Sequence, residues 1–223
     1  APYNDSNGSN SGYVQVYSFN GSGWEQVGSD IDGEAEWDRS GWSVSLSSDG
    51  TILAASAAEY NSNQGRIKIY QYTNSDWNQL GSSIDGDGTS QLGREGVNLS
   101  SDGSIVASIS WGSSGKVRVF ETGINRTVTG NATLLSASTK PKLNKEGDKL
   151  TILNEYHFDN LSGNGQVQNY EYDISNDSWI KIGNDIESAS VNDISGGDIA
   201  INDEGNMIAI GYPQTNSATG TTK

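Results

Sequence analysis

The fold is decided by the stretch Gly65-Arg66-Ile67-Lys68-Ile69-Tyr70-Gln71-Tyr72, which is followed by Trp77-Asn78-Gln79-Leu80-Gly81. An earlier copy reads Gly12-Tyr13-Val14-Gln15-Val16-Tyr17-Ser18-Phe19 and then Trp24-Glu25-Gln26-Val27-Gly28. Tyr17 and Tyr70 are 53 residues apart, and so are Trp24 and Trp77. Fainter copies begin at Lys116 and Gln166. A period near this length, built from alternating strands, indicates one supersecondary unit per repeat.

The clearest repeat contains four short strands. Trp42–Ser47 alternates and Thr51–Ala57 is rich in small residues, and Asp49-Gly50 between them supplies a hairpin turn with a positive φ. Arg66–Tyr72 forms the third strand and Trp77–Ile84 the fourth. Apolar or aromatic side chains occupy both faces of the third strand, so both faces need a neighbouring sheet. We therefore predict an all-β fold, a β-propeller whose blades are four-stranded antiparallel sheets.

The repeats run through the whole chain as a single domain, 1–223. They lie near 12–64, 65–115, 116–164 and 165–223. The repeated structural positions are the turn glycines and the aromatic residues of the outer strands: Gly50, Gly103, Gly147, Gly205, Tyr17, Tyr70, Phe120, Tyr170, Trp24, Trp77 and Trp179. We expect each large ring to fill the gap between two blades.

Three blades are complete in the sequence and a fourth is split. Residues 13–29 supply the two outer strands of a blade, and residues 196–211 supply two inner strands. Joining these halves within one chain gives about four blades, and joining them between two chains gives eight. In a third alternative the segment is part of a longer propeller. Pairing in some form would hide strand edges that otherwise invite aggregation, so self-association or further blades are expected.

The charge and composition narrow the classes of partner. The formal net charge is −15, and no basic stripe is present, so we expect no nucleic-acid partner and no attraction to anionic lipid. No apolar run is long enough to cross a bilayer, so no membrane insertion is expected. The chain has no cysteine, which leaves its stability to packing and hydrogen bonding.

The repeat resembles the FG-GAP family, best known from the β-propeller head of integrin α chains. The resemblance is carried by an opening strand, a Gly-Ala-Pro-like loop and a closing strand: Gly41-Trp42-Ser43-Val44, then Ala1-Pro2-Tyr3-Asn4 and Gly211-Tyr212-Pro213, then Gly12-Tyr13-Val14-Gln15-Val16-Tyr17. The Trp-x-Gln-Leu/Val-Gly element looks like the variant found in bacterial, algal and viral surface proteins. The resemblance implies an extracellular, cell-surface or virion-surface location and ligand binding through loops.

Calcium is not expected in the place where many FG-GAP members hold it, an Asp-rich loop between the first two strands. Here that connection is only Ser48-Asp49-Gly50, Ser101-Asp102-Gly103, Lys145-Glu146-Gly147 or Asp203-Glu204-Gly205. Calcium takes six to eight oxygen ligands, and a short hairpin cannot wrap around it. We interpret these acidic residues as turn formers and expect no cofactor.

A second acidic cluster lies in the loops between blades. Its members are Asp30, Asp32, Glu34, Glu36 and Asp38, with Asp85 and Asp87 in the next copy. Such loops lie on the propeller face that relatives use for ligands, so these residues are the candidates for binding a cation or a partner. If the chain binds calcium, we expect it at this cluster. The other interpretation is a solvated loop.

Catalysis finds little support in the residues. His157 is the only histidine, and no cysteine nucleophile, phosphate loop or nucleophile elbow is present. We expect a non-enzyme, an interaction module that binds protein or glycan through its loops. Two alternatives stay open: a structural repeat block of a surface fibre or virion, and a glycan-processing enzyme.

Overall fold

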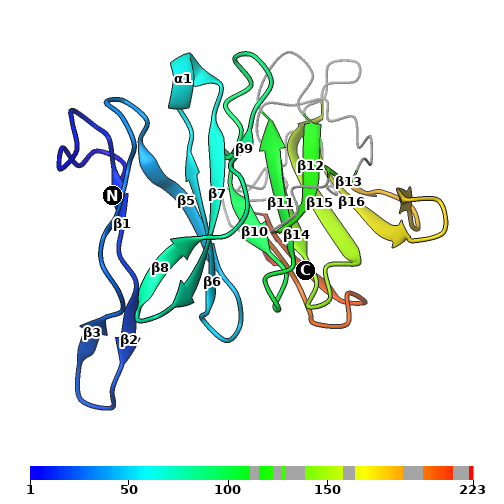
Figure 1. Cartoon of the computed structure of the whole chain (residues 1–223). Coiled ribbons are helices and arrows are strands. Elements are labelled where there is room, and N and C mark those ends of the chain that lie inside the picture. Colours follow the sequence, from blue (N-terminus) through cyan, green and yellow to red (C-terminus); the bar gives the residue numbers. More distant parts are fainter. Residues whose placement is uncertain are drawn as a thin grey trace.

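The computed structural model describes residues 1–110, 116–122, 127–128, 139–157, 164–187, 198–212 and 221–222. Three antiparallel sheets with the same strand order follow one another along the chain (Figure 1). Blade 1 contains β5 (Ser40–Leu46), β6 (Ile52–Ala57), β7 (Arg66–Thr73), β8 (Asp76–Gln79) and β9 (Ile84–Asp85). Blade 2 contains β10 (Val97–Leu99), β11 (Ile105–Ser110), β12 (Lys116–Glu121) and β13 (Thr127–Val128). Blade 3 contains β14 (Thr139–Leu143), β15 (Lys149–His157), β16 (Asn164–Asp173), β17 (Ser178–Lys181) and β18 (Ile186–Glu187).

Partial sheets flank the three blades. The N-terminal ribbon consists of β1 (Tyr13–Val14), β2 (Tyr17–Phe19), β3 (Trp24–Gln26) and β4 (Ile31–Asp32). The C-terminal hairpin consists of β19 (Ile199–Ile201) and β20 (Ile208–Tyr212), with β21 (Thr221–Thr222) beside β20. One short helical segment, α1 (Tyr60–Asn63), lies between β6 and β7. The predicted all-β propeller with three complete blades and two partial ones is confirmed.

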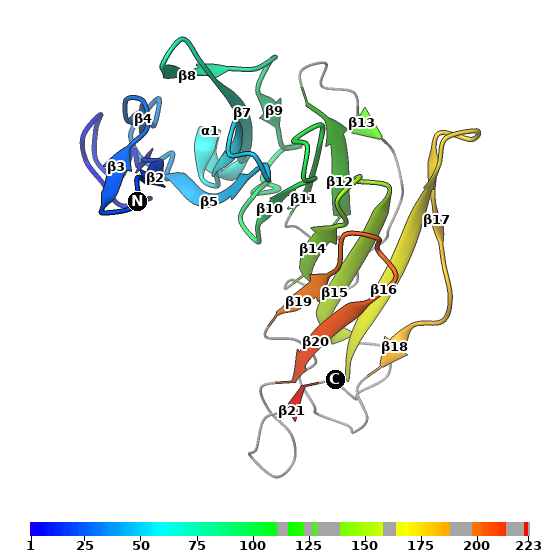
Figure 2. The same ribbon diagram turned by 90° about the horizontal axis from the view of Figure 1, so that it is seen from below.

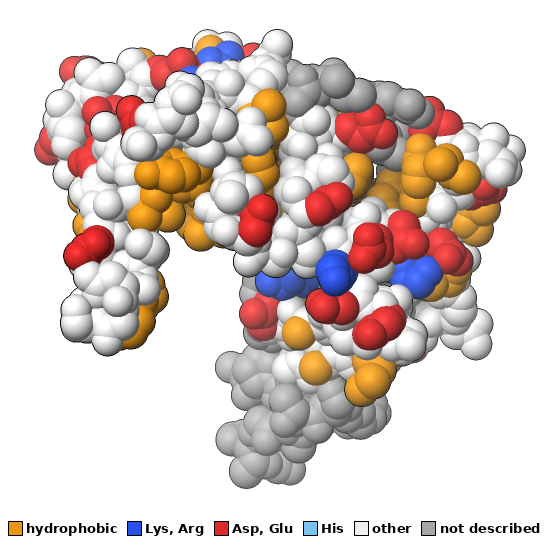
Figure 3. Space-filling view, turned by 60° about the horizontal axis from the view of Figure 1, so that its bottom comes forward, with side chains coloured by type: hydrophobic (Ala, Val, Ile, Leu, Met, Phe, Trp, Pro, Cys, Tyr) orange, Lys and Arg blue, Asp and Glu red, His pale blue; other side chains and the backbone are white. Residues whose placement is uncertain are grey.

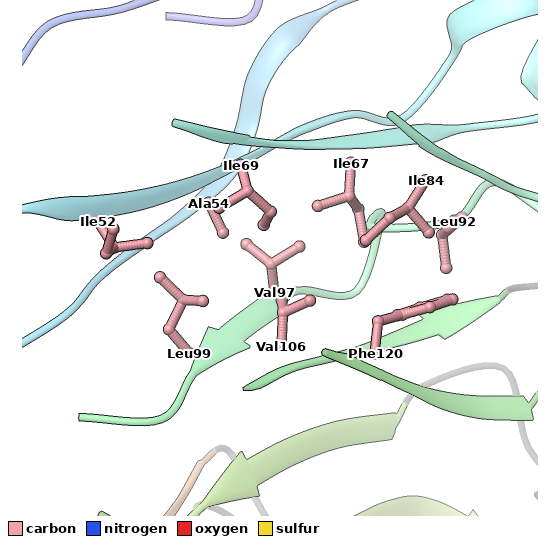
Figure 4. Close-up of a cluster of buried hydrophobic side chains, with 10 residues drawn as sticks. All are labelled: Ile52, Ala54, Ile67, Ile69, Ile84, Leu92, Val97, Leu99, Val106 and Phe120. Carbon is pink, nitrogen blue, oxygen red and sulfur yellow. The ribbon is translucent and has the colours of Figure 1, made fainter. Parts of the chain in front are cut away.

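The core lies between successive sheets because the second strand of a blade is largely apolar on both faces. In β6, Ile52 and Ala54 face blade 2, whereas Leu53 and Ala55 face the N-terminal ribbon. All four are buried. Successive residues of a strand point to opposite faces, so a strand covered on both sides must be apolar throughout. Figure 4 shows the cluster between blades 1 and 2: Ile52, Ala54, Ile67, Ile69, Ile84, Leu92, Val97, Leu99, Val106 and Phe120.

The turns between the first two strands of blades 1 and 2 are built as predicted, whereas in blade 3 the Asn144 side chain, and not Glu146, accepts the bond from the Lys149 amide (2.9 Å). Asp49 accepts hydrogen bonds from the Ser47 hydroxyl (2.7 Å) and from the Thr51 amide (3.0 Å). Asp102 accepts the equivalent bonds from Ser100 (2.7 Å) and Ser104 (2.9 Å). These bonds lower the pKa of Asp49. Both carboxylates are therefore committed to their own turns.

Hydrogen bonds also join these turns from blade to blade. The Ser48 amide donates to the Ser101 carbonyl (2.7 Å), the Ser101 amide to Lys145 (3.0 Å), and the Lys145 amide to Asp203 (3.3 Å). One backbone contact thus repeats between successive blades and fixes their spacing.

The sheets form an open arc. In the described part of the chain, β1 pairs with β4 and β2 with β3, and β20 pairs with β19 and β21, so neither partial sheet pairs with the other. Figure 2 shows the N-terminal ribbon and the C-terminal hairpin at separate ends of the arc. Among the described residues, the four-bladed ring closed within one chain is therefore not formed.

The open arc corrects the expectation for the repeated aromatic positions of the N-terminal ribbon. Trp77 is 8% exposed, and Tyr70, Tyr170 and Trp179 are half-buried. Trp24, at the position of Trp77, is 70% exposed, and Tyr17 is 47% exposed. The rings that pack are those with a blade before them, and no blade precedes the N-terminal ribbon in this structure.

Candidate functional site

The loops that carry the acidic cluster lie at the end of the blades opposite to the Asp-Gly turns (Figure 1). β4 leads into the loop 33–39, and β6 leads into α1, so the two loops meet where the N-terminal ribbon joins blade 1. The Glu59 amide lies 3.4 Å from the Asp38 carbonyl oxygen, and the Arg39 guanidinium is 2.7 Å from the Glu59 carboxylate. These contacts tie the two loops together.

Two of the predicted acidic residues are paired with Arg66 on β7. Its Nε and Nη2 donate to the two oxygens of Asp85 at 2.6 and 2.9 Å. Its Nη1 donates to Glu34 at 2.8 Å, and Lys68 donates to the same carboxylate. The hydrogen bond from Lys68, with help from Arg66, lowers the pKa of Glu34. The Arg66 guanidinium also stacks on Tyr60, 3.7 Å from the ring centroid. Both carboxylates are thus neutralised by cations of the protein itself.

Asp38 behaves differently because it is buried. Asp38 is 5% exposed, and one of its carboxylate oxygens accepts a 3.0 Å hydrogen bond from the Ala35 amide. Burial raises the pKa of Asp38, because desolvation penalises the charged form. The side chain shapes the loop 35–38 from inside.

The remaining members of the cluster point elsewhere. Asp30 accepts hydrogen bonds from the side-chain amides of Gln15 (2.9 Å) and Gln26 (2.6 Å). Asp32 and Glu36 are exposed, and the Asp87 side chain is 86% exposed, 3.8 Å from Arg118. Within the described ranges no three acidic or histidine side chains converge as a metal ion would require. The seven acidic residues that the sequence placed in one candidate cluster therefore do not gather at one point in the fold.

A groove opens beside this charge network, between the loop 35–38 and α1. Its volume is about 480 Å³, and it is lined by Ala35, Glu36, Trp37, Asp38, Glu59, Tyr60, Asn61, Ser62 and Asn63. Trp37 is one of the residues that line this groove, and it is 54% exposed. Sequence reasoning missed this residue, although it is a tryptophan outside the repeat register of Trp24, Trp77 and Trp179.

The backbone around the groove is held in an uncommon conformation. Trp37 has φ of 67°, and Asn61, Ser62 and Asn63 have φ of 48°, 60° and 72°. Left-handed residues other than glycine each cost on the order of 1–3 kcal/mol and persist where the surroundings over-determine them. Here the Gln91 side-chain amide donates to the Asn63 side-chain oxygen at 3.0 Å. The Gln91 backbone amide donates to the Asn63 carbonyl oxygen at 2.9 Å. Such strain gathers at ligand sites more than elsewhere.

A smaller cavity shares Asp38 and Tyr60 with the lining of the groove. It holds about 20 Å³ and is lined by Glu34, Asp38, Arg66, Lys68 and Tyr70 among others. That volume fits one water molecule and no ligand. Burial raises the pKa of Tyr70 to about 12, so this phenol stays protonated and is no general base at neutral pH.

The described residues bear on the expectations about catalysis and membrane insertion only in part. His157 ends β15, but its side chain lies outside the described residues. In the part of the chain that the structure describes, no helix is long and apolar enough to cross a bilayer.

Comparison of sequences finds no matching protein-family profile and no matching curated protein. Comparison of structures finds many neighbours. TolB from Acinetobacter baumannii superposes with a TM-score of 0.50 at 13% identity, over 94% of this chain and 45% of that one. A putative 6-phosphogluconolactonase from Bacteroides fragilis superposes with a TM-score of 0.53 at 15% identity, over 96% and 64%. The β-propeller domain of the Trilobed protease from Pyrococcus furiosus superposes with a TM-score of 0.47 at 12% identity, over 78% and 48%.

The chain therefore spans between 45% and 64% of the length of these neighbours. At such low identity the likeness concerns the fold alone. The neighbours include both TolB and a putative 6-phosphogluconolactonase, so the shared fold does not decide between an enzyme and a non-enzyme.

Proposed function

We propose that this chain is a non-catalytic binding module that takes a glycan chain in the groove between the loop 35–38 and α1. The observation that carries the proposal is Trp37, an exposed ring in a concave site. Sugars present flat apolar faces that stack on aromatic rings, while their hydroxyls need polar partners. Asn61, Asn63 and Glu36, which carry amide and carboxylate groups, line the same groove.

The groove is shaped before a ligand arrives. The loop 35–38 is fixed by Asp38, and α1 is fixed by the bonds from Gln91 to Asn63 and by the Arg39–Glu59 ion pair. A preorganised site loses little conformational entropy on binding. This supports recognition by the loops, as the FG-GAP resemblance implies, and the same resemblance is the basis for proposing an extracellular, cell-surface or virion-surface location.

The acidic residues of the cluster serve this proposal in two ways. Glu34 and Asp85 hold Arg66, whose guanidinium stacks on Tyr60 in the lining of the groove. Glu36, which is exposed, faces the ligand. The cluster is thus a support for the groove with one contact residue, and neutral or amino sugars suit it better than acidic ones.

The test is a glycan array followed by titration of intrinsic tryptophan fluorescence with the glycans that bind. Trp37→Ala should abolish binding, and Trp37→Phe should retain part of it because a ring remains. Ile174→Ala is the matched control, since Ile174 is 84% exposed on blade 3, far along the chain from the groove, and should bind as the unchanged protein does. Equal binding by Trp37→Ala would contradict the proposal. Release of shorter sugars from a bound polysaccharide would reassign the chain to glycan processing, and capture of a protein alone would reassign the groove to a protein partner.

A second candidate role, a structural repeat block of a larger assembly, is favoured by a different observation. Hydrophobic residues are exposed at both ends of the arc, among them Leu46 (46%) and Met207 (69%). A block of this kind would bind no glycan, so the array separates the two roles.

A further inference from the structure

The turn glycines make one contact that repeats from blade to blade. A Cβ built on Gly103 would lie 2.7 Å from the Cβ of Ile52 in blade 1, and one built on Gly147 would lie 2.9 Å from Ile105 in blade 2. One built on Gly205 would lie 2.4 Å from Lys149 in blade 3. In each case the glycine packs on the residue that lies two positions after the turn glycine of the preceding blade. Gly50 has nothing within 4 Å, because no inner strands precede blade 1.

The missing half of this contact is present at the other end of the chain. Met207 lies two positions after Gly205, so it occupies the place that Ile52 occupies after Gly50. Ile52 is 7% exposed under blade 2, whereas Met207 is 69% exposed. Ala209, at the position of the fully buried Ala54, is exposed as well. The C-terminal hairpin therefore carries the inner face of a blade without the blade that covers it.

Blade 1 carries the face that would provide this cover. Val97 and Leu99 on β10 are each 7% exposed because they pack on Ile52 and its neighbours. Val44 and Leu46, at the same positions of β5, are 50% and 46% exposed. The residues on the two bare faces thus occupy the same repeat positions as residues that form the core between blades 1 and 2.

The backbone of this face is prepared in the same way. The amides of Val97 and Leu99 donate to the hydroxyls of Ser43 and Ser45 on the preceding blade, at 3.0 and 3.1 Å. Val44 pairs with Ala55 in the register in which Val97 pairs with Ser108. The amides of Val44 and Leu46 on β5 thus occupy the places of the Val97 and Leu99 amides, and Asp198 of the hairpin occupies the place of Ser43.

The outer strands repeat this complementarity with other residues. The Trp77 ring packs on Gly28, where a Cβ would lie 2.8 Å from Cδ1, and its Nε1 donates to the Val27 carbonyl at 2.8 Å. At the equivalent places, Trp24 is 70% exposed and Gly183 has nothing within 4 Å. The Trp24 ring already leans on Phe19 (5.5 Å, 52°) as Trp77 leans on Tyr72 (5.3 Å, 51°), so the ribbon has the shape needed for the contact.

We infer that the two ends of the arc bind each other between two copies of this chain. The C-terminal hairpin of one copy supplies the inner strands, and the N-terminal ribbon of the other supplies the outer strands, of one shared blade. Met207 of the first copy then meets Gly50 and Leu46 of the second, and Trp24 of the second meets Gly183 of the first. β21, which in the described part of the chain pairs with β20 through Thr221 and Thr222, yields its place to β1 of the other copy.

The contact is head to tail, and it closes into a ring of two copies when each copy spans half of the turn. Two copies contribute three complete blades each and share two composite ones, and the ring closes with no bare face left. The space-filling view in Figure 3 shows hydrophobic side chains on the protruding N-terminal ribbon and on the lower part of the body, with the arc hollow between them. Exposed apolar surface of this kind marks an interaction site.

The charge of the chain sets how this association responds to salt. Each copy carries −15, so two copies repel each other, while the contacts named above are apolar or between backbone groups. Added salt screens the repulsion and leaves the contacts intact. Association should therefore strengthen with ionic strength, whereas ion-pair-driven binding would weaken.

The experiment measures the mass of the full 223-residue chain by light scattering over a concentration series. The expected result is a shift from 23.7 kDa towards twice that mass, enhanced by salt. Leu46→Asp and Met207→Asp should each remove the shift. Ile174→Asp adds the same charge at another exposed apolar residue and should leave it unchanged. A monomer at every concentration, or equal loss in all three variants, would overturn the inference.

Cysteine trapping then places the contact, because the chain has no cysteine of its own. Leu46→Cys and Met207→Cys are made as separate chains, mixed and treated with a short bifunctional maleimide. The expected product is a cross-linked pair that contains one chain of each kind, and a mixture of Leu46→Cys with Ile174→Cys should give none. Equal cross-linking in the control mixture would overturn the inference. So would a cross-link within a single chain that carries both Leu46→Cys and Met207→Cys, because it would show that the arc closes on itself.

Discussion

The indole Nε1 of Trp77 donates a 2.8 Å hydrogen bond to the carbonyl oxygen of Val27, 50 residues earlier in the chain. The donor opens the outer strand of blade 1, and the acceptor follows the outer strand of the N-terminal ribbon. The same ring packs with Leu53 and Ala55 of its own blade and with Val14 and Ile31 of the ribbon. One side chain thus provides apolar contact and a satisfied polar group between two sheets.

Trp77→Ala should therefore lower the free energy of unfolding by about 3–5 kcal/mol, as expected for removal of a buried aromatic ring. Trp77→Phe should fall between the two, because a ring remains while the Val27 carbonyl loses its donor. Trp24→Ala is the matched control: the repeat position is the same, but the ring is 70% exposed. Urea denaturation of dilute, monomeric protein measures all three. A loss below about 1 kcal/mol for Trp77→Ala would mean that the ring contributes little burial.

The two aspartates with opposite pKa shifts give a prediction on pH. Burial raises the pKa of Asp38, so the folded chain holds this proton more tightly than the unfolded chain does. The stability that this group contributes is complete below the unfolded pKa of about 4 and is lost as pH rises through the folded value. Asp38→Asn keeps an oxygen for the Ala35 amide and removes the charge. We expect it to be at least as stable as the unchanged protein at neutral pH.

Asp49 supplies the control because its pKa is lowered, first by the hydrogen bond from Ser47. Its contribution is present above the unfolded pKa and is lost as pH falls through the folded value. Asp49→Asn should therefore destabilise the protein at neutral pH and make little difference in acid. Thermal melts between pH 3 and pH 7, a range that brackets the ordinary aspartate pKa of about 4, measure both variants. If both substitutions act in the same direction at neutral pH, the burial of Asp38 is not what controls its proton.

The acidic loops also lead to a prediction on calcium. Glu34 and Asp85 are paired with Arg66, and the Asp49 and Asp102 carboxylates are bonded within their turns. A calcium ion would have to displace these partners to gather six or more oxygens. Thermal melts in millimolar calcium and in chelator should agree within error. A rise of many degrees with calcium would point to a site formed by the exposed residues Asp32, Glu36 and Asp87.

The sequence predicted the blades well because each strand, turn and aromatic position recurs within its own repeat. It could not distinguish Trp24 from Trp77, which have the same local pattern, because burial depends on the neighbouring blade. The pairing of Arg66 with Glu34 and Asp85 also escaped prediction. Arg66 lies on a strand whose alternation explains its position, and its partners come from two different loops that only the packing of ribbon and blade brings together. The groove at Trp37 was missed for the same reason.

The turn glycines allow the last prediction, which separates backbone strain from contact between blades. Gly103 and Gly50 have nearly the same conformation, with φ of 73° and 71°. Alanine at either position pays the cost of a left-handed residue, roughly 1–2 kcal/mol. Only at Gly103 would the new methyl also lie 2.7 Å from Ile52, so that blades 1 and 2 must move apart at a further cost of about 1–3 kcal/mol. In dilute protein, Gly103→Ala should thus unfold at clearly lower urea than Gly50→Ala. At concentrations where two copies associate, Gly50→Ala should weaken the association, because its methyl would press on Met207 of the other copy. Equal urea midpoints for the two variants in dilute protein would show that the turn glycines are required for φ alone and that the blades do not meet there.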